Sequence, residues 1–337
     1  MASESVNIAF IGCGGIVRDH LDHGLGSFPD VKFVGWCDIK REHAEERRAQ
    51  VNGQGEVFED PEQMLRATSP DAVYIMLPPF AHGPAEDVVL SHDLPFFVEK
   101  PVAIELQTAR RVHEAVREKG LVTTVGFMNR YRDSLLEVRK RVERSNPVLM
   151  HGGWVGGCPD PHEGVGRWWV RKEKSGGQFL EQTVHTIDLA RYLFGDVRSV
   201  YAVPVTGRMP RPDFYTIEEA SMVQLTFENG AAGNLYSSCA TPQGGGISLE
   251  VWTTDMHARL DGWEHSARID EPDGTQTDIR GEESIFAKED RAFIDAVRTG
   301  DAGGLLCSYE DGFKSVQIAC AADESMRTGN PVDICEA

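Results

Sequence analysis

Short apolar runs alternate with amphipathic stretches between residues 6 and 126, and this alternation restricts the fold more than any other feature of the chain. We expect the apolar runs to form buried strands at Val6–Ile11, Val31–Cys37, Ala72–Leu77, Phe96–Val98 and Leu121–Gly126. Helical patterns lie between them, for example at Glu42–Val51, Pro84–Ser91 and Leu106–Lys119. Strands that alternate with helices form βαβ units, so we predict an α/β domain with a doubly wound parallel sheet.

The pattern changes beyond residue 145, where strands follow strands. One strong helix is expected at Thr183–Phe194, and two amphipathic helices close the chain at Ser284–Thr299 and Tyr309–Met326. The expected strands are Val197–Val205, Ala220–Glu228, Ala231–Ser238, Ser248–Thr254 and Ala258–Leu260. Successive strands without intervening helices pair antiparallel, so we predict an α+β region with a largely antiparallel sheet.

Length and charge limit the classes of protein that this chain can represent. Its 337 residues exceed one compact core, and we expect two domains, at residues 1–127 and 128–337. The net charge of -19 repels phosphate backbones, which argues against a nucleic-acid partner. No apolar run approaches the roughly 20 residues that span a bilayer, and we find no signal peptide.

Cysteine usage indicates a reducing compartment. The seven cysteines are Cys13, Cys37, Cys158, Cys239, Cys307, Cys320 and Cys335. Their number is odd and no two have C-x-x-C spacing, so we expect neither a disulfide framework nor a closed zinc site. The sequence therefore predicts a cytoplasmic protein without a structural metal.

A glycine-rich turn, Gly12-Cys13-Gly14-Gly15-Ile16, follows the first strand directly and opens a helix. Gly12 permits the tight turn, and Gly14 lets backbone N–H groups approach a pyrophosphate, whose charge the helix N-terminus favours. Val17 occupies the third position of the usual fingerprint, where glycine or alanine is common. Taken alone, such a turn is equally consistent with a strand-to-helix connection that binds no ligand.

Asp38 ends the second expected strand, where an acidic side chain accepts hydrogen bonds from the adenosine ribose of a dinucleotide. A carboxylate there repels a 2′-phosphate, so the sequence favours NAD. Lys40 and Arg41 follow immediately and keep NADP as the alternative cofactor. A simple turn residue at a strand end is the other interpretation of Asp38.

Glu99-Lys100-Pro101 follows the strand that ends at Val98, at the sheet edge where α/β proteins bind ligands. A lysine there can hydrogen-bond a substrate hydroxyl and stabilise negative charge as its proton leaves. A surface salt bridge between Glu99 and Lys100 is the simpler interpretation of these residues alone.

Glu181 and His185 are four residues apart at the entry to the middle helix, so we expect them to share one helix face, with Asp188 one turn further on. A carboxylate beside an imidazole can orient it and raise its basicity, which suits a general base. A buried core histidine and a carboxylate favoured by the helix dipole are the alternatives.

The segment Gly152–Ser175 has the composition of a long loop, and such loops are usually functional. We expect side chains of this loop to line a substrate pocket, namely His162, Trp168, Trp169, Arg171 and Lys172. For the two adjacent tryptophans, one packed inward and one covering an apolar edge is the alternative.

Taken together, these motifs resemble those of the Gfo/Idh/MocA oxidoreductases, which include inositol and sugar dehydrogenases. The likeness covers nearly the whole chain. It includes the glycine turn with His20 after it, Leu77-Pro78-Pro79-Phe80-Ala81-His82, Glu99-Lys100-Pro101, Val125-Gly126-Phe127 before Arg130-Tyr131, Ser175-Gly176-Gly177 before Glu181-x-x-x-His185-x-x-Asp188, and Glu289-x-x-x-Phe293. The chain departs from the common pattern at Leu77, where relatives usually have threonine, and at Glu181, where they usually have aspartate.

The resemblance implies a Rossmann domain followed by a domain with a large, open antiparallel sheet that often forms the oligomer interface. It implies catalysis by Lys100, His185 and Glu181. The implied cofactor site comprises Gly12, Gly14, Gly15, Ile16, Asp38, Leu77, Pro78, His82, Glu99 and Lys100, and Arg130 is assigned to the substrate.

The expected function is hydride transfer between NAD and a secondary hydroxyl of a sugar, sugar derivative or cyclitol by a homodimer or homotetramer. Two other classes stay open on the sequence alone. Some relatives are glycosidases that use NAD for transient oxidation, and others are non-catalytic regulators that bind a dinucleotide.

Overall fold

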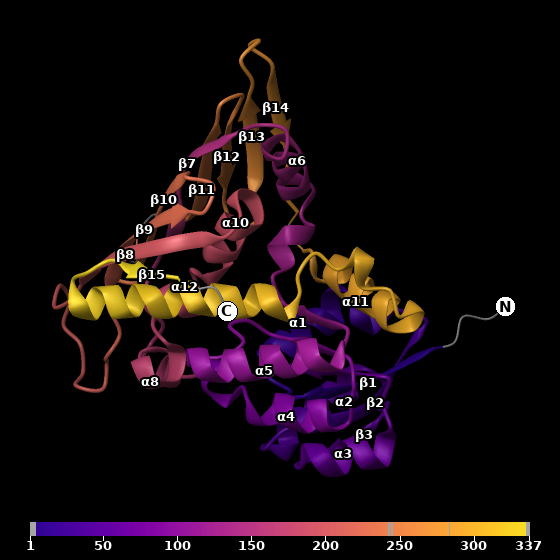
Figure 1. The fold of residues 1–337 in the computed structure, drawn as a ribbon. Helices are drawn as coiled ribbons and strands as arrows, with labels where there is room; N and C mark the ends of the chain where they lie inside the picture. Colours follow the sequence, from indigo (N-terminus) through magenta and orange to yellow (C-terminus); the bar gives the residue numbers. More distant parts are fainter. Residues whose placement is uncertain (1–4, 242, 244, 283, 335–337) are drawn as a thin grey trace. The chain divides into compact units, whose positions relative to one another are not determined.

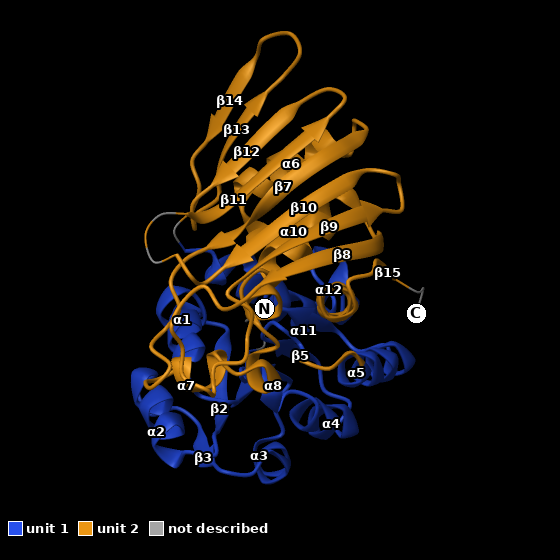
Figure 2. Ribbon diagram, turned by 90° about the vertical axis from the view of Figure 1, so that its left-hand side faces the viewer, with its two compact units in different colours: residues 1–103, 107–128, 284–313 blue, residues 104–106, 129–283, 314–337 orange. Residues whose placement is uncertain are grey.

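The computed structural model describes residues 5–241, 243, 245–282 and 284–334 (Figure 1). These residues form two compact units, coloured separately in Figure 2. The first contains residues 1–103, 107–128 and 284–313, and the second contains residues 104–106, 129–283 and 314–337. Cys335, one of the seven cysteines, lies outside the described residues. None of the described helices is long and apolar enough to cross a membrane.

The first unit is built on a six-stranded parallel sheet in the order β3-β2-β1-β4-β5-β6. Its strands are β1 (Val6–Ile11), β2 (Val31–Cys37), β3 (Glu56–Phe58), β4 (Ala72–Ile75), β5 (Phe96–Val98) and β6 (Thr123–Val125). The helices in this part of the chain are α1 (Gly15–His23), α2 (Arg41–Gln50), α3 (Pro61–Thr68), α4 (Pro84–Ser91), α5 (Leu106–Lys119) and α11 (Phe286–Thr299). The predicted doubly wound parallel sheet is confirmed.

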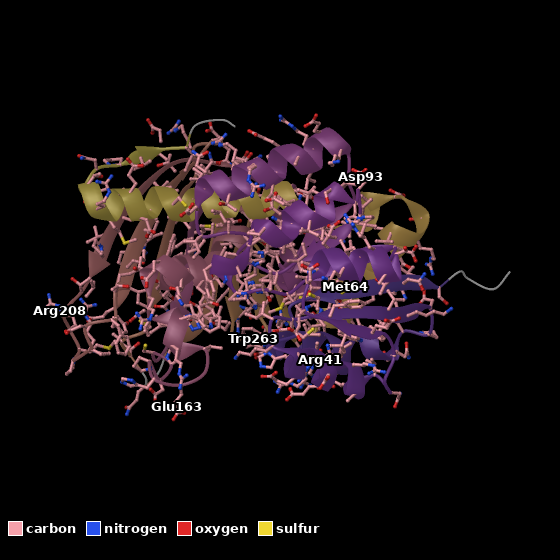
Figure 3. All side chains as sticks on the ribbon, turned by 90° about the horizontal axis from the view of Figure 1, so that it is seen from below. Arg41, Met64, Asp93, Glu163, Arg208 and Trp263 are labelled. Atoms are coloured by element: carbon pink, nitrogen blue, oxygen red, sulfur yellow. The ribbon has the colours of Figure 1, made fainter. Side chains whose placement is uncertain are left out.

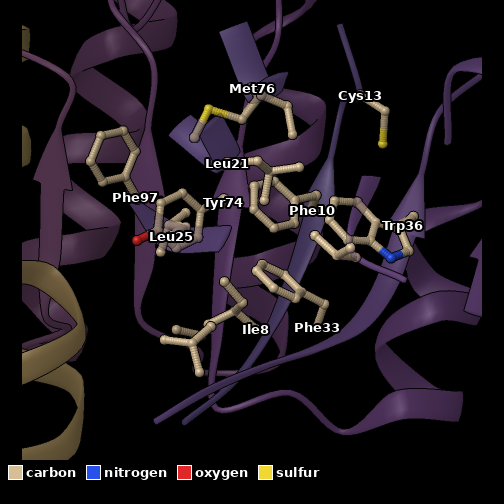
Figure 4. Packing of buried hydrophobic residues seen from close by; sticks show 14 of the residues in the cluster. Ile8, Phe10, Cys13, Leu21, Leu25, Phe33, Trp36, Tyr74, Met76 and Phe97 are labelled. Atoms are coloured by element: carbon tan, nitrogen blue, oxygen red, sulfur yellow. The ribbon is translucent and has the colours of Figure 1, made fainter. Parts of the chain in front are cut away.

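Aromatic rings fill the core on one side of this sheet. Phe10 stacks between Trp36 and Tyr74, with ring centroids 4.7 and 5.1 Å apart (Figure 4). The Trp36 indole N–H is satisfied by the carbonyl of Gln54 at 2.8 Å, so its ring is buried without an unpaired donor. Contacts between these large rings thus fix the register of β1, β2 and β4. The glycine turn follows β1 directly, and Asp38 follows β2 directly.

Helix α11 belongs to the first unit, although we expected its residues in the second domain. Its Phe293 and Ile294 are fully buried in the same apolar cluster as Ile8 and Phe10. The Phe293 and Tyr74 rings pack in a T-shaped arrangement, with their centroids 5.4 Å apart. The amphipathic pattern reveals that α11 has one apolar face but not which sheet that face covers, so a single boundary after residue 127 does not describe these units.

The second unit contains a nine-stranded sheet in the order β14-β13-β12-β11-β7-β10-β9-β8-β15. Its strands are β7 (Pro147–Val155), β8 (Val197–Val205), β9 (Ala220–Phe227), β10 (Ala232–Ser238), β11 (Gly246–Thr253), β12 (His257–Asp261), β13 (Ser266–Asp270), β14 (Gln276–Ile279) and β15 (Val332–Asp333). All neighbours pair antiparallel except β7 and β10, which are parallel. The prediction of a mostly antiparallel sheet is confirmed.

The helices α6 (Asp133–Val142) and α10 (Val184–Phe194) accompany this sheet, and α12 spans Tyr309–Thr328. The expected loop Gly152–Ser175 is partly regular structure. It begins inside β7 and contains α7 (Gly166–Trp169) and α8 (Lys172–Ser175), followed by α9 (Gln178–Glu181).

Gly152 and Gly153 lie within β7 because neighbouring strands approach them closely. A Cβ atom on Gly153 would lie 1.9 Å from the carbonyl oxygen of Tyr236. Glycine therefore serves here as a strand residue that allows close backbone approach, and the prediction that a loop begins at Gly152 was wrong.

Candidate functional site

The glycine turn in the first unit has the shape that a bound pyrophosphate needs. Gly12 has φ +88°, and a Cβ atom on it would lie 2.3 Å from the carbonyl oxygen of Met76, so only glycine fits. No atom lies within 4 Å of where a Cβ on Gly14 or Gly15 would project. Gly14 is the N-cap of α1 and supplies no side-chain cap. This space at the start of a helix fits an anionic group that accepts backbone N–H bonds.

Asp38 is tied to the same turn. Its Oδ2 accepts the backbone N–H of Cys13 at 2.8 Å, and its Oδ1 accepts that of Lys40 at 2.8 Å. Arg41, one possible ligand for a 2′-phosphate, directs its Nε to Glu45 at 3.0 Å. The carboxylate is thus fixed beside the glycine turn, as the ribose-binding acidic residue of a dinucleotide site must be.

The thiols beside Asp38 are held in their neutral form. Burial raises the pKa of Cys13 far above its ordinary value, and the charge of Asp38 raises it further. Burial likewise raises the pKa of Cys37 to about 12, with Asp38 again adding to the effect. Neither thiol is a candidate nucleophile, because the thiolate is the reactive form.

His82 holds the loop that begins at Leu77. Its Nδ1 lies 2.6 Å from Glu86 Oε1 and its Nε2 lies 3.2 Å from the Leu77 carbonyl oxygen. Glu86 also accepts the backbone N–H of Gly83 at 2.5 Å. Both ring nitrogens of His82 are thus used inside the loop, which fixes the backbone of Leu77 and Pro78. Direct cofactor contacts of these residues stay predictions.

Glu99 is not part of a surface salt bridge, which was the simpler interpretation of the sequence. Its side chain is buried, and its Oε1 lies 3.4 Å from His20 Nε2. Its Oε2 accepts the backbone N–H of Lys100 at 3.1 Å. The peptide bond between Lys100 and Pro101 is cis. Glu99 is therefore an internal support for the backbone that carries Lys100.

Glu181 and His185, in the second unit, do not lie on one continuous helix. Helix α9 ends at Glu181 and α10 begins at Val184. The i→i−4 ladder is interrupted between them, because the N–H of Thr183 reaches back five residues to Gln178 and that of His185 only three, to Gln182. The expectation that both residues lie on one regular helix was therefore wrong.

The Glu181 carboxylate has a partner from the expected loop. Trp169 Nε1 donates to Glu181 Oε2 at 2.6 Å, and the Trp169 ring is buried in a cluster with Val170, Tyr215, Ile217 and Cys239. His185 is also buried, with 8% of its surface exposed. Trp169 therefore packs inward and orients Glu181, while the neighbouring Trp168 is half-buried at the edge of the same cluster.

Arg130, which we assigned to the substrate, makes a buried bidentate pair with Asp188. Its Nε and Nη2 donate to the two carboxylate oxygens at 2.9 and 2.6 Å. Its guanidinium also lies over the Tyr192 ring, 4.7 Å from the centroid. This geometry favours a role in anchoring α10, because the buried guanidinium is paired with a carboxylate of that helix.

The remaining loop residues differ in exposure. His162 is exposed, with its ring centroid 5.4 Å from that of Phe214, and the Arg171 guanidinium lies over the Phe214 ring, 4.8 Å from its centroid. Lys172 Nζ is bound by Glu218 at 3.0 Å and Asp323 at 2.7 Å. Glu163, labelled in Figure 3, points away from the ribbon. Lys172 is thus an internal ion-pair partner, and only part of the loop is available to a ligand.

A group that sequence reasoning did not assemble lies in the first unit. His20, Glu99, Glu289 and Asp290 are all buried, and they come from segments up to 270 residues apart. The motifs already singled out His20, Glu99 and Glu289 one by one, and two charged residues at consecutive positions of α11 were a further signal, because the apolar face of a helix rarely holds them. Among the residues that the structure describes, no cluster of His, Cys, Asp and Glu side chains could hold a metal ion.

Comparisons with known proteins find relatives for both parts of the chain. A family model described as "Oxidoreductase family, NAD-binding Rossmann fold" matches residues 6–127, and one described as "GFO/IDH/MocA C-terminal domain" matches residues 145–259. The chain is 27% identical to scyllo-inositol 2-dehydrogenase (NAD(+)) of Bacillus subtilis over 343 residues, covering 98% of this chain and 97% of that one. It is 26% identical to inositol 2-dehydrogenase of Rubrobacter xylanophilus, covering 98% and 93%.

Solved structures share the fold. Myo-inositol 2-dehydrogenase from Lactobacillus plantarum superposes with a TM-score of 0.82 at 22% identity, covering 98% of this chain and 100% of that one. Levoglucosan dehydrogenase in complex with NADH gives a TM-score of 0.85 at 18% identity, covering 99% and 100%. At these identities the likeness shows the architecture alone.

Proposed function

Because the chain belongs to the Gfo/Idh/MocA oxidoreductase family, with its NAD-binding Rossmann domain, we propose that it oxidises a secondary hydroxyl of a sugar, sugar derivative or cyclitol. The observation that carries this proposal is the open glycine turn with Asp38 fixed beside it. Relatives that match almost the whole chain and are named inositol 2-dehydrogenases support the substrate class.

We assign separate roles in this reaction to the residues of the candidate site. Gly12, Gly14 and Gly15 would hold the pyrophosphate of NAD, and Asp38 would hold the adenosine ribose. When bound, NAD supplies the acceptor for the hydride that leaves the carbinol carbon. We assign His185 to removal of the hydroxyl proton and Lys100 to stabilisation of the developing alkoxide.

Glu181 is assigned to orientation of the substrate. Its carboxylate is oriented by the Trp169 indole, which donates to one of its oxygens. The longer glutamate arm, in place of the more common aspartate, would reach further into a pocket. We place Trp168, Arg171 and His162 at the substrate as well.

The decisive experiment incubates the purified protein and NAD with a panel of cyclitols and sugars and follows absorbance of reduced nicotinamide. Lys100→Ala and His185→Ala should each lower turnover by about 10²–10⁴-fold with little change in NAD affinity. Net hydrolysis of a glycoside without accumulation of NADH would favour the glycosidase class. NAD binding without turnover on any member of the panel would favour a regulator.

We also propose that the protein works in the cytoplasm as a homodimer or homotetramer that associates through the nine-stranded sheet. Val203 and Met222 are opposite each other on β8 and β9, and they are 47% and 46% exposed. Adjacent exposed apolar side chains on one sheet face are typical of an interface.

A further inference from the structure

The first unit buries an imidazole together with three carboxyl groups, which we call the His20 cluster: His20, Glu99, Glu289 and Asp290. Their exposed fractions are 0%, 6%, 1% and 0%, respectively. Burying so many ionisable groups costs free energy unless they are paired. The cluster therefore requires a physical reason beyond packing.

His20 bridges two of the carboxylates. Its Nδ1 lies 2.9 and 3.0 Å from the two oxygens of Asp290, and its Nε2 lies 3.4 Å from Glu99 Oε1. A carboxylate accepts hydrogen bonds, so a ring that serves one at each nitrogen must carry a proton on both. His20 is thus an imidazolium clamped between Asp290 and Glu99.

Two of the groups that face His20 support this charged state, namely Asp290 from α11 and Glu99 after β5. Glu289 from α11 and the Tyr74 ring from β4, whose centroid lies 6.2 Å from that of the imidazole, also face it. Burial alone would lower the pKa of His20, but the charge of Asp290 and the hydrogen bonds to both carboxylates raise it well above its ordinary value.

Glu289 does not compete for the imidazolium. Burial raises its pKa well above the ordinary value, and neither of its oxygens has a hydrogen-bond partner among the described residues. It is therefore a neutral acid, and the charged part of the cluster consists of one cation and two carboxylates.

A hydrogen bond connects the cluster to the backbone of Lys100. Glu99 uses its second oxygen, Oε2, to accept the Lys100 N–H at 3.1 Å. Gly126 leaves room for this carboxylate, because a Cβ atom there would lie 2.7 Å from Glu99 Oε1. Contacts on both sides thus leave Glu99 little freedom.

We propose that His20 is a positioning residue of the reaction: anchored by Asp290, it holds the Glu99 carboxylate, which in turn fixes the backbone of Lys100. The inference rests on the proposed function, in which Lys100 acts on the substrate. Without the cation, Glu99 and Asp290 lose their shared partner and Glu99 is free to shift. Misplacement of a catalytic group by about 1 Å costs on the order of 10²-fold in rate.

A double-mutant cycle tests the proposal. His20→Gln should lower kcat by about 10- to 100-fold while the Kd for NAD, measured by calorimetry, changes by less than about threefold. Glu99→Gln should have a similar effect. If His20 acts through Glu99, the double variant should be no slower than Glu99→Gln alone, within about twofold. Multiplicative losses, or a His20→Gln enzyme with normal kcat, would overturn the proposal.

The same substitution on the exposed face of α1 gives a matched control. His23 is exposed, with its Nδ1 3.0 Å from the backbone oxygen of Asp19, and His23→Gln should leave kcat unchanged. A loss of kcat in His23→Gln equal to that in His20→Gln would contradict a specific role of His20.

A measurement on the unaltered protein separates this inference from the proposed function and does not depend on whether the variants fold. Nitrogen-15 NMR should show His20 still protonated at both ring nitrogens at pH 7.5, where an ordinary histidine is neutral. A single-tautomer neutral ring at pH 7.5 would refute the clamp even in an active enzyme. Conversely, an imidazolium signal in a protein that oxidises no polyol would refute the proposed function and leave the charged cluster standing.

Discussion

At the scale of single residues, Glu289 and Asp290 show how a buried cation separates two neighbouring carboxyl groups, because burial raises the pKa of both but only Asp290 is paired with His20. Asp290 is paired with His20, and Glu289 is a neutral acid without a partner among the described residues. Asp290→Asn should lower the free energy of unfolding by about 3–5 kcal/mol, because it leaves a buried charge without its partner. Glu289→Gln replaces one neutral group by another and should cost less than about 1 kcal/mol near pH 5. Urea unfolding of both variants measures the difference.

The pH dependence of the free energy of unfolding should also differ between wild type and Glu289→Gln. The pKa of Glu289 is raised in the folded state, so the unfolded state releases this proton first, and the contribution of Glu289 to wild-type stability falls as pH rises above about 4.5. Glu289→Gln lacks this proton. Its stability relative to wild type should therefore increase with pH, by at most about 1.4 kcal/mol per unit. A difference that is flat from pH 5 to 8 would mean that Glu289 is ionised in the folded protein.

Asp38 carries the choice of cofactor. Asp38→Asn keeps an oxygen that can accept the Cys13 N–H but removes the charge that would repel a 2′-phosphate. The ratio of the Kd values for NADP and NAD should fall by about tenfold, which corresponds to about 1.4 kcal/mol. Calorimetric titration of both cofactors into wild type and variant measures it. A wild-type protein that binds NADP more tightly would instead assign Lys40 and Arg41 to the phosphate.

At the scale of elements, the sequence predicted some strands to the residue and missed others for physical reasons. Val6–Ile11, Val31–Cys37 and Val197–Val205 are apolar or alternating runs bounded by turn residues, and their observed bounds are the expected ones. β7 contains paired glycines, which resemble a loop until the neighbouring strand is known.

The candidate functional site could likewise be predicted only in part from the sequence. Gly12, Asp38 and Lys100 follow strands directly, so their sheet edge could be predicted from sequence. The contact between Trp169 and Glu181, and the clamp of His20 by α11, depend on how separate elements pack. The break between α9 and α10 depends on local hydrogen bonding that the four-residue spacing of Glu181 and His185 conceals.

Gly153 gives an element-scale test of this explanation. Gly153→Ala places a Cβ atom 1.9 Å from a backbone oxygen of Tyr236 in β10, so β7 must move. The free energy of unfolding should fall by about 1–3 kcal/mol or more. Gly304→Ala is the matched control, because no atom lies within 4 Å of its Cβ position. Equal stability of the two variants would mean that β7 and β10 are not in this register.

At the scale of the whole molecule, the net charge of -19 makes self-association depend on a specific apolar surface, because like charges otherwise repel. Val203 and Met222 provide such a surface on the nine-stranded sheet. Met222→Asp places a charge in the middle of it and should shift the native mass, measured by light scattering after size exclusion, toward the monomer. Gln107→Asp adds the same charge at an exposed position of α5, outside this sheet, and should leave the mass unchanged. A wild-type monomer, or an unchanged mass in Met222→Asp, would show that this face is not the interface. Dissociation with retained turnover would further show that one chain holds the complete site, whereas joint loss of both would tie catalysis to assembly.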